Sequence, residues 1–255
     1  MVDEIADNWY EDFFKGINCE IWEKAIPDDI TRQEVDFLVG ELNLQQGQHV
    51  LDIPCGFGRH SIELSKRGFY VTGIDISETF IKSLRNKIDS EKLNIKAIQA
   101  DILTVQLSET FSGALCLGNS FGYFSAHKMK SFVEKISSSL RSGGKVIINS
   151  GMVAESILPN FSNYAKNKSY TVGNITMDVT NIYKVEDSYM ISNLLYTKEG
   201  KTEEHSFKHY VFTLGEIKRL LEQYGLRTMA TYSSTSKSPY KFGDQQVYIV
   251  AEKHQ

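Results

Sequence analysis

Short apolar runs alternate with amphipathic stretches between residues 47 and 151. Runs rich in Val, Ile and Leu predict strands at 48–53, 70–75, 95–100, 114–117 and 145–149. Apolar residues at helical spacing predict helices at 59–66, around 80–88 and at 129–140. Strands that alternate with helices in this way build a parallel sheet covered on both faces. The pattern therefore predicts an α/β fold with a doubly wound, mostly parallel sheet.

The pattern changes after residue 151. Three strand-like runs, at 175–183, 189–197 and 205–212, are separated only by short charged turns, which predicts an antiparallel β insertion acting as a lid. The chain then returns to a helix opened by the capping pair Thr213 and Glu216, and it ends in two strands, the last of them antiparallel. We therefore expect three parts: residues 1–150 with the N-terminal helices and the cofactor-binding half, residues 151–213 with the lid, and residues 214–255 with the closing helix and hairpin.

The N-terminal part carries a second capping pair and a group of aromatic residues. Thr31 and Glu34 have the spacing at which each side chain reaches an exposed backbone N–H of the other, which predicts a helix from there to Leu42. The aromatic residues fit either a lid helix over a ligand or plain core packing, and both interpretations stay open. They are Trp9, Tyr10, Phe13, Phe14 and Trp22.

The 255 residues carry a net charge of −4 and three cysteines. Because nucleic-acid binders usually have a basic domain, we expect a small-molecule partner and no nucleic acid. The cysteines are too far apart for a zinc-binding C-x-x-C pair and cannot complete a disulfide framework, so we expect no metal site and a reducing compartment. The start of the chain does not resemble a secretory signal, and the longest charge-free stretch, 111–126, is too short to cross a membrane. We therefore expect a soluble cytoplasmic protein without membrane attachment, and its oligomeric state stays open.

The most informative segment is Val50-Leu-Asp-Ile-Pro-Cys-Gly-Phe-Gly58. A buried strand enters a tight Gly-x-Gly turn and then a helix, so backbone N–H groups face a crevice at the carboxyl end of the strand. Asp52 lies inside that strand, where its carboxylate would repel a pyrophosphate. The acid suits a ligand with a cationic group. S-adenosylmethionine fits, because its amino group can pair with Asp52 while its carboxylate meets the helix N-terminus.

A second acid, Asp75, ends the next strand. It follows the glycines by about 20 residues, which is the place of a carboxylate that accepts hydrogen bonds from both hydroxyls of a ribose. The dinucleotide fingerprint would place its third glycine at Ser61, so the chain departs from that fingerprint. The acids and glycines together favour S-adenosylmethionine over a dinucleotide.

Four segments in chain order resemble the motif series of class I S-adenosylmethionine-dependent methyltransferases, which have a Rossmann-like fold. They are Asp52-x-x-x-Gly56-x-Gly58, Gly73-Ile-Asp75-Ile-Ser77, Ala100-Asp101-Ile102 and Gly118-Asn119-Ser120-Phe-Gly-Tyr123. The resemblance covers roughly residues 30–150 and the closing helix and strands. It implies a cofactor site in which different residues contact the methionine end, the ribose and the adenine of the cofactor. These are Asp52, Gly56, Gly58, Leu117, Gly118 and Asn119 for the methionine end, Asp75 for the ribose, and Ile76, Asp101 and Ile102 for the adenine.

The glycine turn also departs from the family pattern. Pro54 stands where the family usually has Gly, and proline has no N–H to donate to a ligand. The form Pro-Cys-Gly-x-Gly-Arg-His nevertheless resembles a variant found in bacterial small-molecule methyltransferases of this class. We count Pro54 and Arg59 among the cofactor-binding candidates. For Arg59 and His60, the alternative of a surface Arg and a partly buried His stays open.

Two residues are candidates for the chemistry itself. Tyr123 follows the fourth strand, where the resembled class places substrate-facing residues. It is a candidate either for orienting the nucleophile or for closing over the sulfonium, whose positive charge suits an aromatic face. Alternation along the last insertion strand puts His205, Phe207 and His209 on one face. If that face covers the pocket, His209 or His205 is a candidate base. For all of them packing is the competing interpretation.

The expected function is transfer of a methyl group from S-adenosylmethionine to N or O of a small molecule by in-line displacement. Such a reaction mainly needs alignment and desolvation, so no catalytic triad is required. An amine acceptor is the first choice, by likeness to small-amine N-methyltransferases. Two alternatives stay open: an NAD(P)-dependent oxidoreductase that uses the same crevice, and a non-catalytic cofactor-binding protein.

Overall fold

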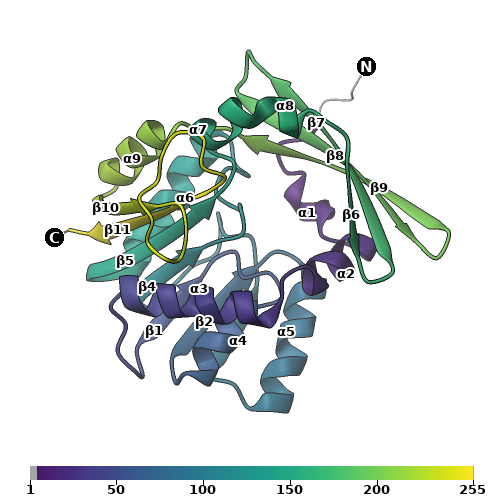
Figure 1. Ribbon diagram of the computed structural model, residues 1–255. Coiled ribbons are helices and arrows are strands. Elements are labelled where there is room, and N and C mark those ends of the chain that lie inside the picture. Colours follow the sequence, from purple (N-terminus) through teal and green to yellow (C-terminus); the bar gives the residue numbers. More distant parts are fainter. Residues whose placement is uncertain (1–4, 255) are drawn as a thin grey trace.

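The computed structural model describes residues 5–254 and contains two β-sheets (Figure 1). The larger sheet has seven strands in the order β10-β11-β5-β4-β1-β2-β3. Their bounds are β1 His49–Asp52, β2 Tyr70–Asp75, β3 Ile95–Gln99, β4 Phe111–Cys116, β5 Leu140–Ser150, β10 Leu226–Tyr232 and β11 Val247–Lys253. Strands β1 to β5 pair in parallel, and β11 runs antiparallel to both β5 and β10. The predicted Rossmann-like α/β fold with an antiparallel last strand is confirmed.

Helices cover both faces of the large sheet. On one face α3 (Asp28–Glu41), α4 (Arg59–Lys66) and α5 (Glu78–Glu91) bury Leu38, Leu64 and Leu84 in one apolar cluster. On the other face α6 (Ala126–Ser139) and α9 (Leu214–Gln223) bury Phe132 and Ile217 in a second cluster. These faces match the helical spacing of apolar residues in the sequence. None of the helices within residues 5–254 is long and apolar enough to cross a membrane.

The two predicted capping pairs have different outcomes. Thr213 and Glu216 form the expected reciprocal cap of α9, with the Glu216 N–H 3.1 Å from Thr213 Oγ1 and the Thr213 N–H 2.8 Å from Glu216 Oε2. The prediction that Thr31 caps a helix is wrong, because α3 already begins at Asp28 after Pro27. Pro27 has the extended conformation that precedes the helix. The acidic residues Asp28 and Asp29 in the first turn stabilise the positive end of the helix dipole.

The second sheet contains four antiparallel strands in chain order. They are β6 Lys168–Val172, β7 Ile175–Lys184, β8 Tyr189–Lys198 and β9 Lys201–Tyr210, and they follow the short helices α7 Ala154–Ile157 and α8 Phe161–Tyr164. The three longer strands were expected from the sequence. Strand β6 was not, because its residues are mostly exposed and show no alternating burial.

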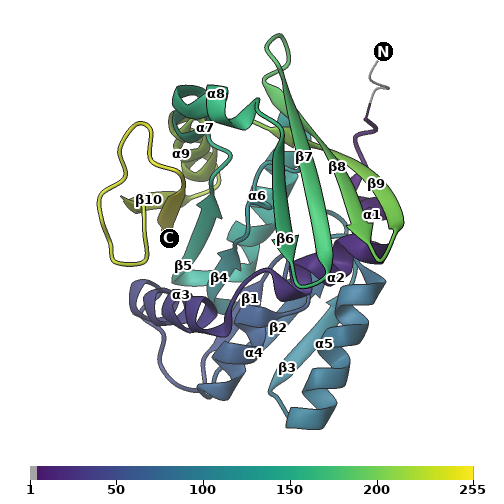
Figure 2. The same ribbon diagram turned by 45° about the vertical axis from the view of Figure 1, so that its right-hand side comes forward.

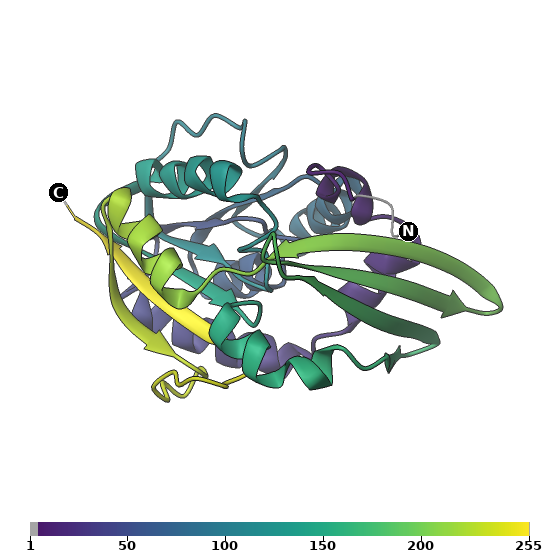
Figure 3. The ribbon, with the colours of Figure 1, turned by 90° about the horizontal axis from the view of Figure 1, so that it is seen from above.

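Two N-terminal helices, α1 (Tyr10–Phe13) and α2 (Gly16–Lys24), lie against this second sheet (Figures 2 and 3). The Tyr196 hydroxyl donates to Asn18 Oδ1 at 2.8 Å in a buried position. The Ile17 N–H donates to the Glu203 carboxylate at 2.8 Å. We call α1, α2 and strands β6–β9 together the cap. The helices and the sheet of the cap are thus joined by hydrogen bonds between parts of the chain that are far apart in sequence.

Candidate functional site

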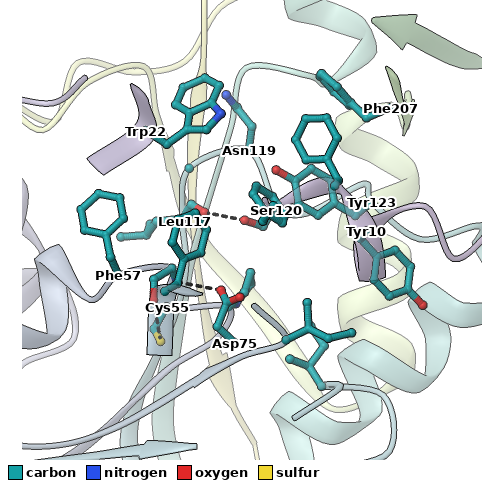
Figure 4. Close-up of a pocket in the computed structure, with 18 of the residues that line it drawn as sticks. Tyr10, Trp22, Cys55, Phe57, Asp75, Leu117, Asn119, Ser120, Tyr123 and Phe207 are labelled. Atoms are coloured by element: carbon teal, nitrogen blue, oxygen red, sulfur yellow. Dashed lines mark hydrogen bonds between the residues drawn. The ribbon is translucent and has the colours of Figure 1, made fainter. Parts of the chain in front are cut away.

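A cavity of about 360 Å³ lies between the carboxyl ends of β1–β4 and the cap (Figure 4). Most of the residues singled out from the sequence line it. These are Pro54, Gly56, Arg59, Asp75, Ile76, Asp101, Ile102, Leu117, Gly118, Asn119, Tyr123 and His209. Asp52 and Gly58 are not among the lining residues. The volume falls in the range of small-molecule sites.

Asp75 is the buried carboxylate of this pocket, at the end of β2. Its oxygens accept the N–H of Gly56 at 2.8 Å (Figure 4) and the N–H of Ser77 at 2.9 Å. Burial raises the pKa of Asp75 to about 6, while the two backbone donors act in the opposite direction. A carboxylate has roughly four acceptor positions, so two remain for a ligand that offers paired hydroxyls.

Two glycines leave open backbone on the wall of the pocket. Gly56 (φ +55°) and Gly118 (φ +70°) adopt the left-handed conformation, and a Cβ built on either would meet nothing within 4 Å. Gly58 differs, because its Cβ would lie 2.5 Å from Leu84 Cδ1, so this glycine permits close packing of the turn against α5. The space beside Gly56 and Gly118 is where a ligand can approach the backbone, which is the feature that a cofactor held by this turn requires.

Asp52 lies behind the turn. It is 1% exposed, and its carboxylate accepts the Ser61 hydroxyl at 2.7 Å. Burial raises the pKa of Asp52, although nearby His60 and hydrogen bonds from Ser61 act to lower it. Because Gly58, the residue before α4, has no side chain to cap the helix, Asp52 supplies the acceptor for its first turn from the neighbouring strand. The structure therefore does not bring Asp52 to the pocket, and its direct contact with a ligand stays a prediction.

Arg59 lines the pocket from the first turn of α4 and is paired with α3. Its guanidinium donates to the Glu34 carboxylate and, at 3.1 Å, to the Thr31 hydroxyl. His60 Nε2 lies 3.0 Å from the same carboxylate. Hydrogen bonds from His60 and Arg59 hold the pKa of Glu34 at about 2, although burial acts in the opposite direction. The residues expected to cap α3 thus fix the glycine turn to α3.

Asp101 and the two isoleucines form the far end of the pocket. The Asp101 carboxylate accepts the Leu103 N–H at 2.8 Å, which orders the turn after β3. Ile76 and Ile102 also line the cavity from the ends of β2 and β3. Together they provide apolar surface next to a single carboxylate, a combination that suits a flat ring bearing an amino group.

Aromatic side chains from the cap, the glycine turn and the loop after β4 line the pocket on two sides. Figure 4 shows Tyr10, Tyr123 and Phe207 on one side of the pocket, with Trp22 and Phe57 on the other. The rings of Phe13 and Phe207 have centroids 5.2 Å apart, so α1 and β9 contact each other here. We define the aromatic wall as Tyr10, Phe13, Phe14, Trp22, Tyr123 and Phe207, which all line the cavity. Of the N-terminal aromatics only Trp9 is absent from the lining, and it packs on Tyr123 at 5.0 Å between centroids.

Several lining residues were not singled out from the sequence as site residues. They are Ile26, Cys55, Phe57, Phe80, Ser120, Phe124 and Met152. Phe57 lies between the two glycines of the turn, a position that itself signals proximity to the pocket. Ile26 and Met152 carry no comparable signal, since they reach the cavity only because the cap folds over the sheet.

Tyr123 lies in the loop between β4 and α6, and its ring contacts Trp9 and His209. The Tyr123 and His209 ring centroids are 5.6 Å apart in an edge-to-face arrangement. Burial raises the pKa of the Tyr123 phenol above its usual range. The hydroxyl therefore stays protonated at neutral pH, and the ring rather than a phenolate is what Tyr123 offers to the pocket.

His209 joins β9 to the loop after β4. Its Nε2 lies 2.7 Å from the carbonyl oxygen of Asn119, and its Nδ1 lies 3.1 Å from the carbonyl oxygen of Tyr210. Burial lowers the pKa of His209 to about 4. A neutral imidazole has one N–H, which suits the shorter contact to Asn119. Both ring nitrogens face backbone carbonyls, so neither is directed at a substrate.

Asn119 is therefore held from two directions. It adopts a left-handed backbone (φ +67°), and its side-chain Oδ1 accepts the Gly151 N–H at 2.6 Å. Non-glycine residues adopt this conformation only when their surroundings support it. Here His209 and Gly151 supply that support, and they fix the wall of the pocket formed by residues 117–119.

Comparison with known proteins gives a consistent picture. The family model described as a methyltransferase domain matches residues 50–144. The glycine/sarcosine N-methyltransferase of Aphanothece halophytica is 25% identical in an alignment that covers 97% of this chain and 92% of that protein. An S-adenosylmethionine-dependent methyltransferase from Clostridium acetobutylicum has a TM-score of 0.80 at 15% identity, with 94% of this chain and 97% of that one covered. CalS10, an amino pentose methyltransferase from Micromonospora echinaspora, has a TM-score of 0.68 at 15% identity and covers 95% of this chain and 98% of its own.

The two structural likenesses show the fold, and the family match lies on the strands and turns that form the pocket. The protein is thus a methyltransferase with a Rossmann-like fold. Within that group it is a class I S-adenosylmethionine-dependent methyltransferase.

Proposed function

We propose that this enzyme transfers a methyl group from S-adenosylmethionine to a nitrogen of a small molecule by in-line displacement. The observation that carries the proposal is the pocket itself, in which open glycine backbone and a buried carboxylate face an aromatic wall. A cavity of about 360 Å³ beneath a folded cap favours a small acceptor over a macromolecule. Nitrogen is favoured by the A. halophytica relative, whose name describes an N-methyltransferase.

The residues on the sheet side of the pocket fit this cofactor. Asp75 would accept the ribose hydroxyls, since its two remaining acceptor positions match a vicinal diol. The open backbone at Gly56 and Gly118 would receive the methionine end, with Arg59 nearby. The adenine would lie at the far end of the pocket, where Ile76, Asp101 and Ile102 offer apolar surface and one acceptor.

The cofactor supplies a methyl group on a positively charged sulfur, which leaves as a neutral thioether. The lone pair of the acceptor nitrogen would form the new N–C bond, and the C–S bond would break with its electron pair staying on sulfur. The nitrogen, positively charged after the transfer, would release a proton to water once the product leaves the pocket. The chain contributes alignment and exclusion of water, which in well-aligned reactions lowers a barrier by about 7–11 kcal/mol. An acceptor that arrives uncharged needs no base.

Tyr123 and His209 have different proposed roles. The face of the Tyr123 ring would lie near the positive charge at the reacting centre, because aromatic faces attract cations. His209 would act as a positioning residue through Asn119, since both of its nitrogens face carbonyl groups. Neither role needs a proton to be moved by these side chains.

The decisive experiment is a pair of titrations followed by an activity assay. We expect S-adenosylhomocysteine to bind with NAD unable to compete, and labelled methyl groups to pass to small amines. Binding of NAD that S-adenosylhomocysteine does not displace would contradict the proposal. Cofactor binding without transfer to any amine or hydroxyl in a broad panel would favour a non-catalytic protein. The family match and the relative name methyl transfer, and nothing in them supports the oxidoreductase.

A further inference from the structure

The pocket separates into a polar side and an apolar side. Its carboxylates, Asp75 and Asp101, lie at the ends of the strands, where the cofactor would bind. The aromatic wall, Ile26 and Met152 make up most of the opposite side, and the polar side chains of Asn119, Ser120, His60 and His209 that also line the cavity are not permanently charged. Whatever part of the acceptor lies away from the reacting nitrogen must contact these rings and aliphatic side chains. An apolar or aromatic body gains from that burial, since burying apolar surface is worth about 25 cal/mol per Å².

The pocket also offers little positive charge to an acceptor. Among the described residues that line the cavity, Arg59 alone has a permanent positive charge, and Glu34 pairs with it. Two lysines of the cap are paired with carboxylates elsewhere. Lys208 Nζ lies 2.7 Å from Asp7, and Lys198 Nζ lies 2.6 Å from Glu20. A carboxylate on the acceptor would thus lose water without meeting an unpaired cationic side chain of the protein, which is unfavourable.

From these two observations we infer that the acceptor is an amine on an apolar or aromatic body, with no carboxylate beside the amine. This inference rests on the proposed function and narrows it. Glycine and sarcosine, the substrates in the name of the A. halophytica relative, do not fit, because each consists of an amine and a carboxylate with almost no apolar body. The amine reacts uncharged, forms the N–C bond as the C–S bond breaks, and releases its proton to water.

A matched pair of substrates tests the inference directly. Phenethylamine and phenylalanine share an aromatic body and an amine, and only phenylalanine has a carboxylate. Tryptamine and cyclohexylamine extend the carboxylate-free set, and glycine and sarcosine represent the opposite class. Binding of each is measured by calorimetry on enzyme saturated with S-adenosylhomocysteine, and methylation is measured with labelled methyl donor.

We expect phenethylamine to be methylated with a kcat/KM about 100-fold above that of phenylalanine, the ratio set by an unpaired buried charge. Glycine or sarcosine methylated as well as phenethylamine would overturn the inference and leave the proposed function standing. The absence of binding by all three carboxylate-free amines to the loaded enzyme would also overturn it. If S-adenosylhomocysteine itself does not bind, it is the proposed function that fails.

A positive charge introduced into the aromatic wall tests the inference independently. Phe207 and Glu204 lie on β9, where Phe207 lines the pocket and Glu204 is exposed. We expect Phe207→Arg to shift the preference toward phenylalanine by at least about tenfold, and Glu204→Arg to leave it unchanged. Affinity for S-adenosylhomocysteine should be the same in both variants. An unchanged preference in a folded Phe207→Arg enzyme counts against the inference.

A milder substitution covers the case in which Phe207→Arg does not fold. Phe207→Leu keeps the site apolar but removes a ring, so we expect KM for phenethylamine to rise several-fold while phenylalanine stays a poor substrate. No change in KM would mean that Phe207 does not contact the acceptor, which would contradict the assignment of the wall.

Discussion

The two sides of the pocket are built in different ways. On the sheet side, the surfaces open to a ligand are glycine backbone and a carboxylate at strand ends, and their positions follow from the path of the chain through Gly56, Asp75 and Gly118. On the cap side, the groups are side-chain rings brought together from α1, α2, the loop after β4 and strand β9. In the proposed function, the methyl donor would thus be recognised by the core fold, whereas the acceptor would be selected by side chains that come together when the cap folds over the sheet.

The largest expected effect concerns the backbone of the sheet side. Gly56→Ala adds a Cβ in the space where the cofactor would lie, so we expect affinity for S-adenosylhomocysteine to fall about 100-fold or more. The measurement is calorimetric titration of the variant. Gly173→Ala is the matched control, because Gly173 also has a left-handed backbone (φ +60°) with nothing within 4 Å, but it lies in the turn between β6 and β7. The two variants should lose similar stability. Equal affinities would show that Gly56 does not contact the cofactor.

The next effect concerns the carboxylate of the sheet side. Asp75→Asn leaves one acceptor oxygen where the ribose would need two, so we expect affinity for S-adenosylhomocysteine to fall about 10- to 100-fold at pH 7.5. The wild-type affinity should also fall as the carboxylate becomes protonated, by about tenfold for each pH unit below the Asp75 pKa of about 6. The variant should lack this pH dependence. A variant with the wild-type pH profile would contradict the role of Asp75.

The same variant separates binding from stability. Because the pKa of Asp75 is raised from its usual 3.8 to about 6 in the folded protein, the stability it contributes is present below pH 3.8 and is lost as the pH rises through 6. At pH 7.5 the buried carboxylate therefore destabilises the ligand-free protein. Asp75→Asn removes this charge, but it also replaces one of the two oxygens that accept the Gly56 and Ser77 N–H groups, so the variant should be less stable than the wild type at low pH. We expect this difference in the free energy of unfolding to be smaller at pH 7.5 than at pH 4.5, because only the wild type loses stability as Asp75 ionises. Calorimetry without ligand measures this directly.

The sheet side could be predicted from the sequence because its signals are local. Asp75 and the glycine turn lie in short segments whose spacing follows from one strand, one turn and one helix. The exception is instructive: Asp52 carried the main sequence argument, yet its side chain lies behind the turn and holds Ser61. A strand pattern shows that a residue is buried, but it does not show on which side of the turn its carboxylate lies.

The cap side could be predicted only in outline. Alternation placed Phe207 and His209 on one face of their strand, and both line the pocket. The contacts of Trp22 and Ile26 depend on how α2 lies against β8, a packing between residues more than 150 positions apart, for which the pattern holds no signal. Strand β6 was missed for a different reason, because it pairs only with the neighbouring β7 and its mostly exposed residues show no alternation.

A smaller effect is expected at the joint between the two sides. His209→Leu leaves the buried carbonyl of Asn119 without its donor, so we expect the free energy of unfolding to fall by about 1–3 kcal/mol at pH 7.5. Because the pKa of His209 is lowered to about 4, its contribution is present above pH 6.5 and is lost as the pH falls from 6.5 to 4. The difference between the two proteins should therefore narrow at pH 4.5. His209→Gln, whose amide can donate, should restore part of the loss, and no rescue would mean that packing alone explains it.

The smallest effect is expected at Tyr123, where the two sides meet. If the ring face is what matters, Tyr123→Phe should keep kcat within about threefold of the wild type, because cation–π attraction does not need the hydroxyl. Burial raises the pKa of the phenol, so the hydroxyl has no anionic form to lose at neutral pH. Tyr123→Leu should lower kcat by up to about 30-fold, since it removes the ring and keeps an apolar side chain. If kcat of Tyr123→Phe falls about 100-fold or more, proton transfer must instead be assigned to the Tyr123 hydroxyl. The side of the pocket that faces the acceptor would then take part in the chemistry through a polar group, and it could no longer be described as purely apolar.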